Sequence, residues 1–316
     1  NSPNGRSFLF PLVVHRRALS HANYFIDIHR SVTPTLLECD VLIIDSKFYR
    51  SQWSVEPANV IERLSYFREQ VSGLIYCDTT DSTGTLQVDV LPVVDLYAKA
   101  QLLKNRSEYN FAHYGHRIYT NYYHEHCKVA DFQPSWSVPV TNDIFLEKLV
   151  VSWNSSLADY SLLGPTRMSL YAKCPVSSLL SFPKRTTAPI LPRPFRLHAR
   201  MGTTYDRASI SFQRRALIRK LGPGIATKKL NRHAYLHELS QAQSVLSPFG
   251  LGEITLKDYE TFLCGGCLIK PDMSHMETWP DLFRPGETIA CFNWNLSDFD
   301  EVLTSLSDHS EARIAI

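Results

Sequence analysis

The sequence predicts an α/β protein made of two successive halves, each with buried parallel strands and covering helices. Three observations predict this fold class. Short, continuously apolar segments such as DVLIID at 40–45 are typical of strands buried on both faces of a sheet. Segments with helical periodicity alternate with them, as at 57–71. Five prolines at 174–195 then interrupt the alternation, because proline cannot continue a helix or a central strand. We therefore expect two domains, 1–180 and 181–316.

The first half is expected to begin with strands. The apolar segments of strand length are FLFPLVV at 8–14, YFIDIH at 24–29, DVLIID at 40–45 and GLIYCD at 73–78. PANVIERLSYFREQV at 57–71 has apolar side chains at helical spacing, which predicts a helix with one buried face. DVLPVVDLYAKAQLL at 89–103 predicts a strand or turn that leads into a helix. The Tyr-, His- and Asn-rich segment at 105–150 is expected to be an irregular insertion.

The second half shows a clearer alternation of strands and helices. FRLHA at 195–199 predicts a strand, and RASISFQRRALIRKLGPG at 207–224 predicts a helix that ends at GPG. The elements expected after it are a helix at 233–243, a strand at 244–246, a helix at 255–263, strands at 267–270 and 289–292, and a helix at 297–306. In such open α/β sheets, ligands bind beyond the carboxyl ends of the strands.

Composition and charge exclude several classes of protein. The chain has 316 residues, of which 44% are hydrophobic and 20% charged, as in folded globular proteins. Its formal net charge of +2 gives no reason to expect a nucleic-acid partner. No segment approaches the ~18 continuous apolar residues of a transmembrane helix. Seven scattered cysteines favour a reducing, cytoplasmic location. Because the chain lacks a first methionine and ends in a helical pattern, we expect it to be part of a longer multidomain protein.

The CGGC segment has the spacing of a redox pair or of half a zinc site. Its cysteines are Cys264 and Cys267. A zinc site needs a second pair, which the sequence lacks, and a thioredoxin-type pair opens a helix, whereas this one follows a helix. We therefore expect both thiols to act as small packed hydrophobic groups.

The segment SPFGLGE at 247–253 is the most informative candidate site. Gly250 and Gly252 allow a ligand to approach the backbone closely, and a helix N-terminus that favours phosphate follows them. Glu253, Lys257 and Glu260 are spaced by four and three residues, so they can share a helix face. A cation beside a phosphate site and a carboxylate for sugar hydroxyls suit a nucleoside diphosphate. A solvent-exposed Glu–Lys helix face would have the same spacing.

The longer segment SPFGLGEITLKDYETFLCGGCLIKPD resembles the nucleotide-sugar-binding segment of exostosin-like GT-B glycosyltransferases, in which it begins at a serine equivalent to Ser247. The resemblance implies two Rossmann-like domains facing each other across a cleft. It also implies metal-independent transfer of a sugar from a nucleotide-sugar donor to a glycan hydroxyl, with inversion. Lys257 stands where the family usually has arginine, and Glu260 matches the residue that binds the ribose. Glu253 and Glu260 are seven residues apart, so the eight-residue spacing of many retaining enzymes is not met.

Further donor-binding candidates follow other strands of the second half. Arg200 follows the first of these strands, where the resemblance implies a basic residue for the diphosphate, and its guanidinium can hold two phosphate oxygens. Arg207 and Arg214 are alternatives to it, and His275 can face the donor sugar or the base. Each of these side chains can also be an ordinary surface or packing residue. The nucleotide sugar is a co-substrate, and no further cofactor is expected.

The first half is expected to bind the acceptor and to supply a general base, because a protonated hydroxyl is a poor nucleophile. Asp78 and Asp81 in YCDTTDSTG are the best candidates, although a plain polar turn has the same composition. Tyr97 and Lys99 can line the acceptor site. The His- and Tyr-rich segment at 113–126 can form an acceptor platform, and its HEH triplet is not expected to bind metal.

Two other functions remain open at this point. One is a nucleotide-sugar epimerase or hydrolase, because a fold does not determine its chemistry. The other is a non-catalytic module that binds a glycan or a nucleotide within a longer chain. Incubation with donor alone distinguishes the first of these from a transferase, since only an epimerase or hydrolase converts the donor efficiently without an acceptor.

Overall fold

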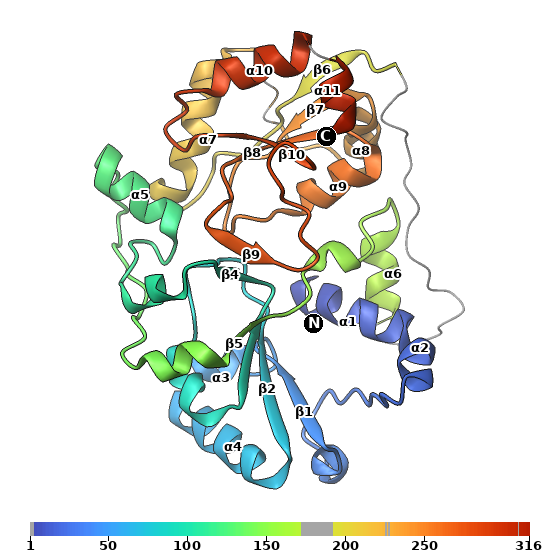
Figure 1. Cartoon of the computed structure of the whole chain (residues 1–316), viewed down its shortest axis with the longest axis vertical. Coiled ribbons are helices and arrows are strands. Elements are labelled where there is room, and N and C mark those ends of the chain that lie inside the picture. Colours follow the sequence, from blue (N-terminus) through green and yellow to red (C-terminus); the bar gives the residue numbers. More distant parts are fainter. Residues whose placement is uncertain (1–2, 172–191, 225, 227, 309) are drawn as a thin grey trace.

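Two parallel four-stranded sheets form the framework of the protein (Figure 1). The computed structural model describes residues 3–171, 192–224, 226, 228–308 and 310–316. The first sheet has the order β1–β2–β3–β5, and the second has the order β10–β8–β7–β6. All pairs within both sheets are parallel. The predicted α/β class with helix-flanked parallel sheets is therefore confirmed.

The first sheet is built from four short segments. They are β1 (Val41–Asp45), β2 (Gly73–Asp78), β3 (Leu96–Lys99) and β5 (Leu149–Val151). Helix α4 (Pro57–Gln70) covers one face of this sheet with Val60, Leu64 and Phe67. Leu42 and Ile44 of β1 point into the same core, while Val41 and Ile43 between them are exposed. The strands predicted at 40–45 and 73–78 and the helix predicted at 57–71 are thus confirmed.

The N-terminal segment differs from the prediction. Residues 8–14 lie in helix α1 (Pro3–Val14) and not in a strand, and Phe8, Phe10 and Val13 are buried. The periodicity of such a short apolar run does not distinguish a buried strand from a buried helix. Residues 24–29 form no strand, and the side chains of Tyr24 and Phe25 are 66% and 81% exposed.

The segment at 89–103 is less helical than predicted, and the segment at 105–150 has more regular structure than predicted. After the 3-10 helix η2 (Val88–Val93), the chain forms β3 and then β4 (Gln101–Leu103), so the helix expected at the end of 89–103 does not form. The segment 105–150 contains helix α5 and strand β5 as well as irregular chain.

The remaining elements of the first half are α2 (Arg16–His21), η1 (Pro34–Leu37), α3 (Arg50–Trp53), η3 (Arg106–Asn110), α5 (Ile118–Cys127), η4 (Asp143–Lys148), η5 (Ser155–Leu157) and α6 (Gly164–Tyr171).

The second half contains the predicted elements in the predicted order, together with a short strand and a terminal helix that were not predicted. Its elements are β6 (Phe195–His198), α7 (Ala208–Leu221), α8 (Arg232–Ser240), β7 (Ala242–Leu246), α9 (Leu256–Cys264), β8 (Cys267–Pro271), β9 (Met276–Thr278), β10 (Ile289–Phe292), α10 (Phe299–Asp308) and α11 (Ser310–Ala315). Helix α7 ends at Gly222, whose φ of 82° suits glycine. Helix α9 begins with a capping box formed by Thr255 and Asp258.

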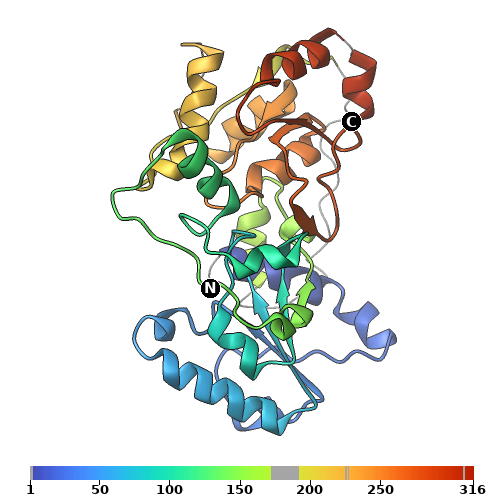
Figure 2. The ribbon, with the colours of Figure 1, turned by 60° about the vertical axis from the view of Figure 1, so that its left-hand side comes forward.

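The two halves are joined by a shared sheet and a shared core (Figures 1 and 2). Strand β4 of the first half pairs antiparallel with β9 of the second. One hydrophobic cluster combines Phe10 and Tyr119 of the first half with Phe249, Tyr259 and Met276 of the second. The predicted boundary between residues 180 and 181 lies outside the described residues, as does most of the proline-dense segment.

The CGGC thiols are packed, as predicted. Cys264 is buried in a cluster with Leu239 and Val245, and Cys267 is buried in another with Leu246 and Ile269. None of the helices among the described residues has the length and apolar character needed to cross a membrane.

Candidate functional site

The loops that follow the carboxyl ends of the strands in the two sheets contact each other. Thr83, after β2, donates hydrogen bonds from its backbone N (3.1 Å) and its Oγ1 (2.5 Å) to the carboxylate of Glu253, after β7. Asn154, after β5, donates from Nδ2 to Thr278 Oγ1 (2.8 Å) and to the Pro280 carbonyl (2.8 Å). Because α/β sheets bind ligands beyond these strand ends, the junction is where a ligand site is expected.

Glu253 is part of this junction and not of helix α9. The helix begins after Thr255, and the Glu253 side chain is fully buried against Thr83 and His275, whose Nε2 lies 3.9 Å from Glu253 Oε1. Burial acts to raise the pKa of Glu253, but the nearby His275 ring and the hydrogen bonds from Thr83 outweigh it, so the pKa is lowered. The predicted helix face shared by Glu253, Lys257 and Glu260 is therefore not formed.

The glycines of the SPFGLGE bend allow other groups to approach the backbone closely, as predicted. In the structure these groups are other residues of the protein and not a ligand. A Cβ added to Gly252 would overlap the carbonyl oxygen of Asp81 in the first half. A Cβ added to Gly250 would lie 3.1 Å from a guanidinium nitrogen of Arg214. Ser247 is fully buried, and its Oγ donates to Asp258 Oδ1 (2.5 Å). The bend is thus covered by other parts of the chain.

A buried ion pair that the sequence analysis missed anchors the bend. Lys270 Nζ donates to Asp258 Oδ2 (2.9 Å) and to the backbone carbonyl of Glu253 (2.7 Å), and neither Lys270 nor Asp258 is exposed. The Nζ also lies 5.6 Å from the centre of the Phe249 ring. The signal in the sequence was a lysine inside the apolar segment CLIKP, since a buried lysine needs a carboxylate partner.

The Lys257 amino group lies at the carboxyl end of β7, and among the described residues no carboxylate lies within ion-pair distance of it. Its Nζ donates to the carbonyl oxygens of Arg200 (2.5 Å) and Leu246 (3.3 Å), and the residue is partly buried. Burial, and then the positive charges of Arg214 and Lys270, lower the pKa of Lys257 to about 7. A lysine with this pKa in a basic environment is a good candidate for binding an anion.

Two arginines donate to the bend, and a third shares a carbonyl acceptor with one of them. Arg214 donates to the Phe249 carbonyl (2.7 Å) and packs on the Tyr205 ring (5.3 Å). Arg117 donates from Nε to the Leu251 carbonyl (2.6 Å). Arg117 and Arg207 both donate to the Gly115 carbonyl, at 2.7 and 3.1 Å.

We call Lys257, Arg214, Arg207 and Arg117 the cation cluster. Within the described part of the chain, none of its members lies within ion-pair distance of a carboxylate. Arg207 and Arg117 also lower the pKa of His116, after the larger effect of burial. The cluster draws on both halves of the protein, and it includes three of the predicted donor-side cations together with Arg117, which the sequence analysis did not identify.

Arg200 and Glu260 are each held by an oppositely charged neighbour. The Arg200 guanidinium forms a fork with Glu238, at 3.1 and 2.7 Å. Glu260 Oε1 accepts from Arg232 Nη1 (2.7 Å), and Arg232 also donates to the Tyr160 carbonyl (2.5 Å) of the first half. Burial raises the pKa of Glu260, against the lowering effect of Arg232. Both predicted donor-binding residues are therefore engaged within the protein.

The structure brings together Asp78, Tyr97 and Lys99 of the first half. Asp78 Oδ2 accepts from Lys99 Nζ (2.6 Å) and from the Tyr97 hydroxyl (2.8 Å), and all three residues are buried. Burial opposes ionisation of Asp78, but Lys99 and the hydrogen bonds outweigh it and lower its pKa. Asp81 is separate from this group, and it lies exposed beside the bend, where its backbone carbonyl accepts from Gln101.

The His- and Tyr-rich segment is ordered by ring stacking. His124 stacks on Tyr114 with ring centres 3.9 Å apart, and His126 stacks on Tyr122 at 4.4 Å. The described residues contain no group of three or more His, Cys, Asp or Glu side chains placed to hold a metal ion. Helix α5 packs against α7, so this segment contacts the second half.

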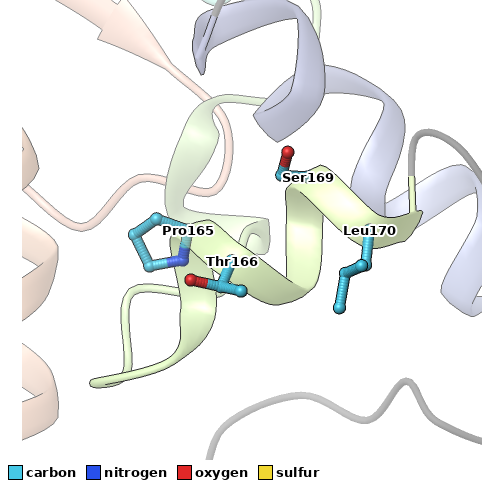
Figure 3. A pocket seen from close by; sticks show the side chains of 4 residues that line it. All are labelled: Pro165, Thr166, Ser169 and Leu170. Atoms are coloured by element: carbon cyan, nitrogen blue, oxygen red, sulfur yellow. The ribbon is translucent and has the colours of Figure 1, made fainter.

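A shallow pocket of about 310 Å³ lies on α6, away from the predicted residues (Figure 3). It is lined by Pro165, Thr166, Ser169 and Leu170, none of which is charged. Its lining offers no group suited to a diphosphate or to acid–base chemistry.

No protein-family model matches the chain, and no curated protein matches it either. The resemblance of residues 247–272 to exostosin-like enzymes therefore stays a sequence-based prediction. Among the arrangements described above, the cation cluster has the clearest chemistry, because it combines several cations with partly accessible positions at strand carboxyl ends.

Proposed function

We propose that the protein is a GT-B-type glycosyltransferase that binds the diphosphate of a nucleotide sugar at the cation cluster. The observation that supports this most directly is the absence of any carboxylate partner for Lys257, Arg214, Arg207 and Arg117 within the described residues. Like charges held close together and partly dehydrated raise the free energy of the protein. A diphosphate between them would remove this repulsion and accept charge-assisted hydrogen bonds.

The arrangement of the two sheets is compatible with this proposal. The carboxyl ends of both sheets meet at the junction, through the Thr83–Glu253 and Asn154–Thr278 hydrogen bonds. Two Rossmann-like domains that face each other in this way form the GT-B architecture implied by the resemblance. Four side-chain cations can balance the charge of a diphosphate, so the proposed reaction needs no bound metal.

The proposed donor site requires the junction to open. Gly252 lies against the Asp81 backbone, and Glu260 is bound to Arg232, so neither the bend nor this carboxylate is free for a nucleotide in the closed arrangement. Separation at the Asp81–Gly252 contact would expose the bend. Glu260 would then release Arg232 and bind a ribose, which is the role that the resemblance implies for this carboxylate.

We assign the acceptor side to the first half, with Asp81 as the general base. Asp81 is exposed and lies beside the bend, whereas Asp78 is buried and bound to Lys99. An accessible carboxylate can take the proton of an acceptor hydroxyl as the bond to the anomeric carbon forms. Asp78 then acts as a positioning residue that holds Lys99 and Tyr97, and the glycan hydroxyl attacks with inversion.

Binding of nucleoside diphosphates tests the donor site. Thermal unfolding is followed with UDP, GDP and ADP, and with CMP as a nucleotide that lacks a diphosphate. A ligand at 100 times its dissociation constant adds about 2.7 kcal/mol to the free energy of unfolding. We expect Lys257→Ala and Arg214→Ala to abolish the shift. Arg215→Ala is the matched control, because Arg215 is an exposed arginine on the same helix as Arg214. Equal shifts in all three variants would contradict the proposed site.

A second candidate function is a non-catalytic nucleotide- or glycan-binding module. The observation that favours it is the complete burial of the Asp78–Lys99 pair, which removes one predicted catalytic carboxylate from contact with substrate. Consumption of a donor that binds, measured with and without glycan acceptors, separates the alternatives. Turnover with acceptor supports the transferase, turnover without acceptor supports an epimerase or hydrolase, and binding without turnover supports the module.

A further inference from the structure

Residues 15–32, the first part of the chain between helix α1 and strand β1, expose several large apolar side chains. This segment includes α2 and irregular chain after it, and we call it the 15–32 strip. The exposed fractions of these residues are 66% for Tyr24, 81% for Phe25, 40% for Ile28 and 48% for Val32. Grouped apolar side chains of this size on a surface mark an interaction site, because their contact with water is unfavourable.

The same strip is basic. Arg16 and Arg17 precede the apolar side chains and Arg30 lies among them, whereas Asp27 is the only acidic residue from 15 to 32. Arg16 Nη2 lies 3.1 Å from Asp27 Oδ1, so the one negative charge is already paired. Both members of this pair remain exposed, with 51% and 84% of their side chains accessible. The strip therefore presents positive charge next to its aromatic rings.

We propose that the 15–32 strip is a docking surface for an anionic lipid membrane. Aromatic and aliphatic side chains can enter the boundary between headgroups and acyl chains, while the arginines bind the lipid phosphates above it. The strength of such binding increases with the apolar area that is buried and with the attraction to anionic lipids, and the strip offers both. This inference does not depend on the proposed glycosyltransferase function, since the strip shares no residue with the cation cluster.

Charge complementarity distinguishes this partner from a second copy of the chain. A two-fold contact between two such strips would place their arginines near each other, and like charges across an interface are unfavourable. An anionic lipid surface can bind these arginines, and the exposed aromatic rings can enter it without a pre-formed groove. Figure 1 shows α2 at the edge of the molecule, away from the β4–β9 junction.

Vesicle flotation with the full chain tests the proposal. One set of vesicles contains phosphatidylcholine alone, and the other contains phosphatidylcholine mixed with phosphatidylglycerol. We expect the protein to float with the anionic vesicles and to stay unbound with the neutral ones. Added salt should release the unmodified protein from the anionic vesicles, because it screens the arginines.

Substitutions locate the contact. Tyr24→Ser with Phe25→Ser should weaken binding by about tenfold or more, because two inserted rings are lost. Arg17→Glu with Arg30→Glu should also weaken it by more than about tenfold, because each change replaces an attraction by a repulsion. The matched controls are Phe132→Ser, at a ring that is 95% exposed elsewhere, and Arg215→Glu on α7. Both controls should bind like the unmodified protein.

Three results would overturn the proposal. The first is no flotation of the unmodified protein with anionic vesicles. The second is equal loss of binding in the strip variants and in the controls, which would indicate a general effect of charge. The third is a dimer that forms without lipid and is lost in the Tyr24→Ser, Phe25→Ser variant, which would assign the strip to a second copy. Because all the substituted side chains are exposed, thermal unfolding should confirm that every variant is folded.

Discussion

Gly252 of the second half packs against the backbone of Asp81 in the first, so closely that a Cβ at position 252 would overlap the Asp81 carbonyl oxygen. This contact joins the bend after β7 to the loop after β2, and it closes the junction between the two sheets. The requirement for glycine at this position is therefore imposed by packing between the halves.

We expect Gly252→Ala to destabilise the protein by about 3 kcal/mol or more, because backbone atoms must move to admit the new methyl group. Gly202→Ala is the matched control, since a Cβ at position 202 meets no atom within 4 Å. Chemical denaturation of both variants gives the two free energies. A Gly252→Ala protein as stable as its control would show that the two halves do not close in this way.

The Glu253 carboxylate should make the protein sensitive to acid. Its pKa is lowered in the folded protein from an ordinary value of 4.5, so it stabilises the fold above about pH 4.5. That contribution is lost as the pH falls through the lower folded pKa, because protonation then removes the charge that Thr83 and His275 bind.

Glu253→Gln should flatten the dependence of the unfolding free energy on pH below 4.5, at the cost of lower stability at neutral pH. Denaturation at a series of pH values measures both effects. Glu69→Gln provides the comparison, because Glu69 is an exposed glutamate on helix α4. An identical pH profile for Glu253→Gln and the unmodified protein would exclude this role for Glu253.

Lys257 should take up a proton when a diphosphate binds. Its pKa of about 7 lies below the ordinary value of 10.5, so much of the side chain is neutral at pH 8. An anion beside it favours the charged form and raises the pKa. Titration calorimetry in two buffers of different ionisation enthalpy should show proton uptake at pH 8.

The same shift predicts a stability trend without ligand. Because the folded pKa of Lys257 is below the unfolded one, its charged form destabilises the fold, and stability should rise as the pH increases from about 7 towards 10.5. Lys257→Gln should remove both this rise and the proton uptake. Proton uptake that persists in the variant would mean that another group responds to the anion.

Asp78 and Asp81 should respond differently to substitution. Lys99→Met should cost about 3–5 kcal/mol, because it leaves the Asp78 carboxylate buried without its cation. Asp81→Asn should abolish sugar transfer while nucleotide binding persists, because the exposed Asp81 carboxylate is the proposed base. Measured turnover in Asp81→Asn at the level of the unmodified protein would remove Asp81 as the base.

The local pattern of apolar residues predicted the helices and strands of the second half well. The strand expected at 289–292 is β10, and the helix expected at 255–263 is α9 within one residue at each end. In the first half the same reasoning predicted a strand at 8–14, where the chain forms α1. Seven apolar residues satisfy both periodicities, and only the packing of α1 against η5 and α6 selects the helix.

Side-chain partners were much harder to predict than elements. Glu253 was expected to face a ligand beside Lys257, but its partner Thr83 lies 170 residues earlier in the chain. One feature of the sequence, a lysine inside an apolar strand, indicated the pairing of Lys270 with Asp258. No feature of the sequence indicated that Glu260 pairs with Arg232. Nor did the sequence indicate that Arg117 and Arg207 both donate to the Gly115 carbonyl.

The sequence by itself determined the alternation of strands and helices and the position of the glycine bend, because these depend on periodicity and on the conformations open to each residue over a few positions. Only the tertiary structure decided which charges are paired within the protein and which cations stay without a carboxylate. A buried charge takes the partner that packing brings to it, and packing joins residues that are far apart along the chain.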